Sequence, residues 1–103
     1  MSPTTTYDFK NLAVLLDNAG IPVSVAAPIF KVSRTTIYSW CEGHAPNQEL
    51  LLSNALRFIA LIEKAHVAGG LPLPGYDKAE MAKGYDVEAT VLQVRKVLKK
   101  FLN

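Results

Sequence analysis

Helical periodicity runs through nearly the whole chain and restricts its fold more than any other feature. Apolar residues recur at intervals of three and four positions, as Phe9, Leu12 and Leu16 do, and no stretch alternates between apolar and polar residues for the length of a strand. The pattern predicts an all-α fold of five or six helices. Of the 103 residues, 50% are hydrophobic and 19% are charged, so the chain can bury a core of its own.

Capping residues and helix-breaking residues place the helices of the N-terminal part. The first helix is expected over residues 7–18, where Thr5 or Thr6 can cap its start and Gly20 can close its end with a positive φ. The following helices are expected over residues 23–30, residues 34–41, and from Asn47 as N-cap to about Ala65.

Glycines and prolines then interrupt the helical pattern. Residues 69–75 read Gly-Gly-Leu-Pro-Leu-Pro-Gly, which excludes a helix and predicts an extended connector. Asp77 with Glu80 predicts a short capped helix that stops at Gly84, and Asp86 can cap a final helix. We therefore expect a core domain over residues 1–68, a connector over 69–85 and a C-terminal amphipathic helix over 86–103.

The final helix carries an apolar seam at heptad-like spacing. Its members are Val87, Val91, Val94, Leu98 and Phe101. Because the connector separates this helix from the core domain, we expect the seam to pair with that of a second copy in a homodimer. The alternative is that the seam packs back onto the core of its own chain. The basic residues beside it either reach phosphates or balance the helix dipole: Arg95, Lys96, Lys99 and Lys100.

Residues 22–43 carry the motif with the most functional content. Ala27 supplies a small side chain where two helices can cross closely, and Ser33 can cap the second of these helices. The apolar side chains expected between the two helices are Val32, Ile37 and Trp40. Together with the Ser33-Arg34-Thr35-Thr36 opening and the Trp40-x-x-Gly43 ending, this segment resembles the helix-turn-helix of the Cro and Xre-like repressor family.

Two positions of the motif differ from the usual pattern of that family. Lys31 stands at the turn position where the family has glycine, and a positive φ is expected there. Pro28 lies inside the first helix of the motif, so we expect that helix to be short or kinked and to begin near Ser24.

The resemblance implies a lambda-repressor-like fold whose second motif helix enters the major groove of DNA. By position, Arg34 is the expected partner of a guanine, and its alternative role is that of a solvated surface arginine. Tyr38 can instead serve simple packing. The residues implied in base contacts are Arg34, Thr35 and Ser39, and those implied in contacts with the DNA backbone are Lys31, Ser33 and Tyr38.

The function that follows is a sequence-specific, double-stranded DNA-binding transcriptional regulator, expected to be a repressor from a phage or a bacterium. The expected partners are double-stranded DNA and a second copy of the chain, with no sensor site for a small molecule. The alternative is a helix-turn-helix-fold protein-interaction module that does not bind DNA, because residues 21–46 hold only two basic side chains and one acidic side chain. The net charge of +2 neither demands nor forbids a nucleic-acid partner.

Other classes of protein find little support in the sequence. Cys41 and His44 could suggest a metal site or a nucleophile with its base, but both need partners that we do not find, so we expect no enzyme, no metal and no cofactor. No apolar run has the roughly 18 residues of a membrane span, and the N-terminus lacks a signal pattern. We expect a cytoplasmic protein.

Overall fold

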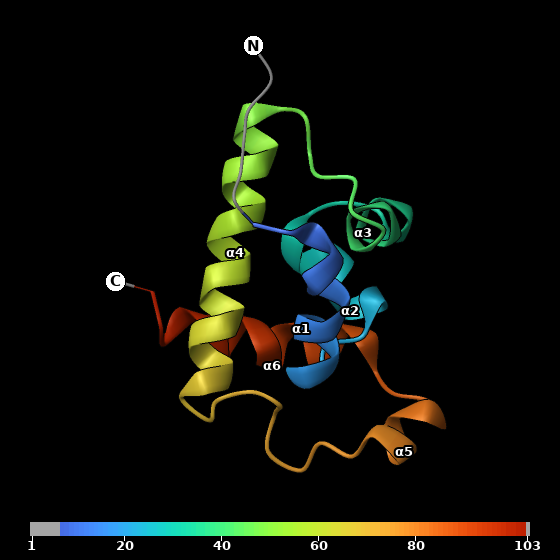
Figure 1. Ribbon diagram of the computed structural model, residues 1–103. Helices are drawn as coiled ribbons and strands as arrows, with labels where there is room; N and C mark the ends of the chain where they lie inside the picture. Colours follow the sequence, from blue (N-terminus) through green and yellow to red (C-terminus); the bar gives the residue numbers. More distant parts are fainter. Residues whose placement is uncertain (1–6, 103) are drawn as a thin grey trace.

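The computed structural model describes residues 7–102, and every regular element in that range is a helix (Figure 1). This confirms the predicted all-α fold. The elements in chain order are η1 (Phe9–Asn11, a 3-10 helix), α1 (Leu12–Asn18), α2 (Val23–Phe30), α3 (Arg34–Cys41), α4 (Glu49–Val67), α5 (Lys78–Ala82) and α6 (Val87–Lys99).

The first predicted helix is divided into η1 and α1. Asp8 caps its start, and the carboxylate accepts a hydrogen bond of 3.0 Å from the backbone N–H of Lys10. The caps predicted at Thr5 and Thr6 lie outside the described residues. Gly20 follows α1 with φ +66°, as predicted, and a β-carbon there would lie 2.9 Å from Cβ of Pro72.

The longest helix, α4, begins one residue later than a cap at Asn47 would place it. The N-cap is Gln48, whose backbone is extended and whose side chain makes no capping hydrogen bond. Pro46 is buried in the preceding loop, so the chain reaches α4 in an extended form. Glu49 provides the negative charge that suits a helix start.

Trp40 lies at the centre of an aromatic cluster that joins three helices to the N-terminal segment. Its side chain is 3% exposed, which confirms its predicted place between the helices of the motif. Phe9 and Phe30 meet it edge-on at centroid distances of 5.9 and 5.8 Å, and Phe58 of α4 meets Phe30 at 5.7 Å.

The connector of residues 69–75 contains no helix, as predicted, but it does not detach α6 from the core. Leu71 is buried, and its carbonyl lies 3.2 Å from Nδ1 of His66 at the end of α4. Gly70 allows a close approach, because a β-carbon there would lie 3.2 Å from side-chain atoms of both Val97 and Phe101. The connector therefore brings the chain back along the core.

The seam of α6 packs against α2 and α4 of its own chain. Val91, Val94 and Leu98 are buried in the same core as α1 to α4, and Figure 1 shows α6 passing behind α4. Of the two alternatives for this seam, the structure shows the intramolecular one. The side chains that we expected to pair in a homodimer are thus already covered.

Two aspartates cap the C-terminal helices as predicted. Asp77 accepts a hydrogen bond of 2.9 Å from the N–H of Ala79, and Asp86 accepts one of 3.1 Å from the N–H of Ala89. Glu80 does not complete a capping box in the described bonds, because its carboxylate binds Nζ of Lys83 at 3.1 Å instead.

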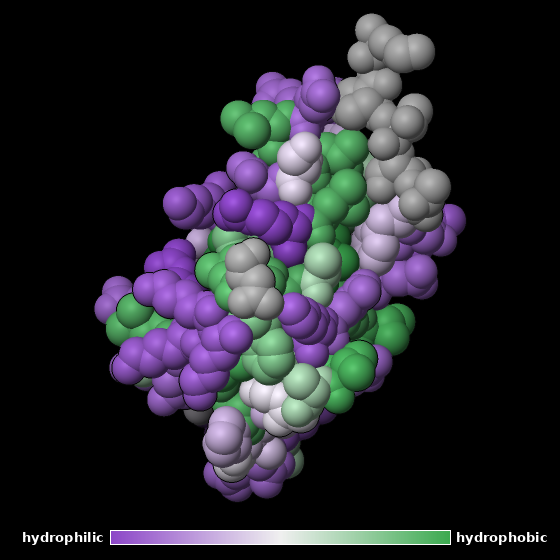
Figure 2. Space-filling model, turned by 90° about the vertical axis from the view of Figure 1, so that its left-hand side faces the viewer, coloured by the Kyte–Doolittle hydropathy of each residue, from purple (hydrophilic) through white to green (hydrophobic). Residues whose placement is uncertain are grey.

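Apolar side chains also reach the surface. Figure 2, which views the molecule from the α4 side, shows hydrophobic side chains exposed between hydrophilic ones. Within residues 7–102 no single helix is long and apolar enough to cross a membrane, although the bent pair Phe9–Asn18 and Val23–Phe30, at 116°, has the combined length and composition.

Candidate nucleic-acid interface

The start of α3 is fixed by a side-chain cap. Ser33 is extended, at φ −76° and ψ 161°, and its Oγ accepts a hydrogen bond of 3.1 Å from the N–H of Thr36. The same oxygen lies 3.0 Å from Oγ1 of Thr36. The cap predicted from the sequence is confirmed, and it directs the first turn of α3.

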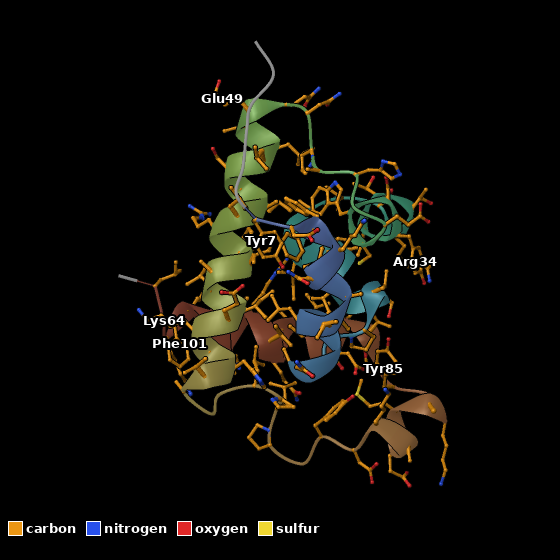
Figure 3. All side chains as sticks on the ribbon, in the orientation of Figure 1. Tyr7, Arg34, Glu49, Lys64, Tyr85 and Phe101 are labelled. Atoms are coloured by element: carbon orange, nitrogen blue, oxygen red, sulfur yellow. The ribbon has the colours of Figure 1, made fainter. Side chains whose placement is uncertain are left out.

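The two long sides of α3 differ in character. Ile37 and Trp40 face the core, whereas Arg34, Thr35 and Tyr38 are exposed. Figure 1 shows α3 on the side of the molecule away from α4, and in Figure 3 the side chain of Arg34 points outward from that side. The structure therefore presents three of the six predicted contact residues on one open surface, which we call the α3 face (Arg34, Thr35, Tyr38).

Pro28 does not interrupt the first helix of the motif. Helix α2 runs from Val23 to Phe30 with Pro22 as its N-cap, so it is short, as expected, and begins one residue before Ser24. Pro28 is exposed, so its ring does not disturb the core. Its carbonyl accepts a hydrogen bond of 3.0 Å from a guanidinium nitrogen of Arg95, which ties α2 to α6.

A hollow of about 390 Å³ lies beside Arg34, between α2 and α3. Ser24, Pro28 and Val32 line it with Arg34, and Val87, the first residue of α6, also reaches it. The hydroxyl of Ser24 makes a hydrogen bond with the hydroxyl of Tyr85 just before α6. The start of α6 therefore lies next to the α3 face.

The other three predicted contact residues, Ser33, Ser39 and Lys31, differ in their surroundings, and Ser33 is exposed at the N-cap directly before Arg34. Ser39 is half-buried, and its carbonyl accepts hydrogen bonds from the N–H groups of Glu42 and His44. Lys31 has the predicted positive φ, 61°, but it lines a different hollow, between α2, α4 and α6. That hollow shares no lining residue with the one beside Arg34.

The structure places one further cation, Lys10, next to the end of α3, and the sequence did not indicate this position. The side chain of Lys10, from η1, lies over Gly43 just after α3, where a β-carbon would come within 3.1 Å of its Cε. No local pattern signals this contact, because the two residues meet only through the packing of η1 on α3.

Within residues 7–102 no hydrogen bond joins Cys41 to His44. The nearest ionic partner of His44 is Glu42, with Nε2 3.9 Å from Oε2, and burial raises the pKa of the Cys41 thiol. A raised pKa lowers the thiolate fraction on which nucleophilic attack depends. In the described part of the chain no three His, Cys, Asp or Glu side chains come together as metal ligands.

Comparisons with protein-family models, with curated protein sequences and with solved structures give no match for this chain. The resemblance of residues 22–43 to a helix-turn-helix therefore stays a prediction from the sequence.

Proposed function

We propose that this chain is a sequence-specific, double-stranded DNA-binding transcriptional regulator that inserts α3 into the major groove. The observation that carries this proposal is the two-sided character of α3, with Ile37 and Trp40 buried and the α3 face open to solvent. A helix that is anchored along one side and capped at its start can present its first turn to base edges. Because residues 22–43 resemble the helix-turn-helix of repressors, repression of transcription is the expected effect of binding.

Each predicted contact residue except Lys31, which lines another hollow, has a proposed role that suits its position. Arg34, in the first turn of α3, can donate two hydrogen bonds to O6 and N7 of a guanine, and the methyl group of Thr35 can contact that of a thymine. Ser39 reaches a base from the margin of the face. Tyr38, together with Ser33, contacts the DNA backbone.

A homodimer is part of the proposal. Two copies of α3 held about 34 Å apart would bind successive turns of the major groove as one unit. Because the seam of α6 is covered by α2 and α4, the contact between copies has to use other surfaces. Sedimentation of the full chain at micromolar concentration tests for the dimer directly.

The first experiment measures binding of the full chain to a labelled random duplex by fluorescence anisotropy over a series of salt concentrations. We expect binding that weakens as salt rises, since phosphate contacts release counterions. If the chain is folded, as measured by circular dichroism, and still does not bind the duplex at low salt, the result contradicts the proposal.

The second experiment tests Arg34 on a duplex selected from a random pool by the chain itself. Arg34→Ala should weaken binding to the selected site by about 1–3 kcal/mol and weaken binding to random duplex much less. Lys64→Ala is the matched control, because it removes one positive charge from α4, on the opposite side of the molecule from Arg34 (Figure 3). Equal losses for the two variants would show that Arg34 does not read a base.

A second candidate function is a protein-interaction module built on the same fold. The specific observation in its favour is the low charge of the α3 face, where Arg34 is the single cation and Tyr38 is 57% exposed, while Lys31 lines another hollow. Such a module would bind no duplex at any salt concentration, and Tyr38→Ala would abolish capture of its partner.

A further inference from the structure

The hollow that contains Lys31 has the dimensions of a small-molecule site. It opens where α2, α4 and α6 meet and has a volume of about 360 Å³, within the range of roughly 300–1,000 Å³ typical of such sites. Its lining consists of apolar residues and basic residues, and no acidic residue takes part.

The floor of the hollow is apolar. Leu61 and Leu98 belong to the core, Phe58 is half-buried, and Leu102 is 50% exposed at the margin. The ring of Phe58 is held edge-on against Phe30, so this part of the floor is fixed by the aromatic cluster. An occupant that covers these side chains displaces water from apolar surface, which favours its binding.

The polar side chains at the rim of the hollow are all basic. Its cations come from two helices, α4 and α6, and from the turn after α2, namely Lys31, Arg57, Arg95 and Lys99. The ion pairs seen within residues 7–102 join other side chains and use none of these four. Arg95 donates to the carbonyl of Pro28, and the guanidinium of Arg57 lies 5.4 Å from the centroid of the Phe58 ring. Four like charges around one opening repel one another, and an anion placed between them relieves that repulsion.

We propose that this hollow binds a medium-chain fatty acid. The alkyl chain packs on Phe58 and Leu98, and the carboxylate accepts hydrogen bonds from Arg57 and Lys99 at the rim. A guanidinium can hold a carboxylate through two parallel hydrogen bonds, so Arg57 adds geometry as well as charge. The proposal concerns a site distinct from the α3 face and does not depend on DNA binding.

The first test compares ligands that share a tail but differ in headgroup. The full chain, labelled at its leucine methyl groups, is titrated below the micelle concentration with decanoate, decanol, decyltrimethylammonium or acetate. We expect decanoate to shift the signals of Leu61, Leu98 and Leu102 in a saturable way, decanol to bind more weakly, and acetate and the cation to cause no saturable shift. Binding of the cation as tight as that of decanoate, or no binding of decanoate, overturns the proposal.

The second test uses two lysines near the end of the same helix. Lys99 lines the hollow and Lys96 does not, although both are exposed. Lys99→Glu should weaken decanoate binding about tenfold, whereas Lys96→Glu, which makes the same change in net charge, should alter it by no more than about twofold. Leu102→Ser should also weaken binding, because it removes apolar contact.

Circular dichroism confirms that each variant is folded before its affinity is compared. Equal effects of Lys99→Glu and Lys96→Glu would overturn the proposal, because they would reveal general charge attraction instead of a defined site. A variant Lys99→Glu that loses duplex binding but keeps decanoate binding would assign the rim to nucleic acid, and would overturn the proposal as well.

Discussion

Lys31 shows how a single residue carries the cost of the turn between α2 and α3. It is the one non-glycine residue with positive φ in the described part of the chain. A left-handed conformation costs an L-residue about 1 kcal/mol, because its Cβ crowds the following carbonyl. A backbone hydrogen bond stabilises the turn, because the N–H of Val32 donates to the carbonyl of Ala27 at 3.0 Å. The helix crossing thus determines the conformation of Lys31.

Replacing Lys31 separates this backbone cost from the role of its side chain. Lys31→Gly should be more stable than Lys31→Ala by about 1 kcal/mol, since both lack the lysine side chain and only glycine lacks the crowded Cβ. Urea denaturation of the two variants measures the difference. A glycine variant no more stable than the alanine variant would show that the turn is unstrained.

Cys41 gives a prediction about pH. Burial raises the pKa of its thiol above the ordinary value of 9.0, so the folded chain disfavours the thiolate. The stability contributed by the neutral thiol is fully present below the pKa of the unfolded chain and is lost as the pH rises from that value through the higher pKa of the folded chain. An aromatic disulfide reagent should therefore react more slowly with the native chain than with the urea-unfolded chain at the same mildly alkaline pH. Equal rates would place the thiol in open solvent.

At the scale of elements, α6 shows what sequence pattern can determine and what it cannot. Asp86 and the seam predicted both the start of this helix and its buried side, because caps and periodicity are local properties. The same spacing suits a dimer seam and an intramolecular face, so the pattern could not identify the surface that α6 covers. That choice depends on Leu71 and Gly70, which return the connector to the core.

Substitutions at two leucines of α6 test whether this helix packs on its own chain. Leu98 is 3% exposed and Leu92 is 59% exposed. Leu98→Ala should lower the free energy of unfolding by about 2–5 kcal/mol, because it leaves a cavity against α2 and α4. Leu92→Ala, the control on the same helix, should change it by less than about 0.5 kcal/mol. Thermal denaturation of the monomer fraction makes the comparison. A small and equal effect of both changes would mean that α6 does not pack on its own chain in solution.

For the whole molecule, the sequence could predict contacts between near neighbours better than contacts between distant ones. The cap at Ser33 and the buried Trp40 were predictable, since each depends on positions within one motif. The bond from Arg95 to Pro28 and the basic rim join residues from distant parts of the chain. Such contacts are consequences of topology, and a single sequence without recurring spacing contains no signal for them.

Truncation after Gly84 tests how far the molecule depends on α6. The truncated chain loses Val91, Val94 and Leu98 from the core, and burying each such side chain contributes about 1.5–3 kcal/mol. That sum is comparable with the total stability of a typical domain, about 5–15 kcal/mol, so we expect a chain with little cooperative unfolding in urea. Adding an excess of a peptide of residues 85–103 should restore the helical signal measured by circular dichroism, because it supplies the missing face of the core. A truncated chain that unfolds cooperatively as a stable monomer would show instead that residues up to 84 form a complete domain, and that the seam of α6 is free to pair with a second copy.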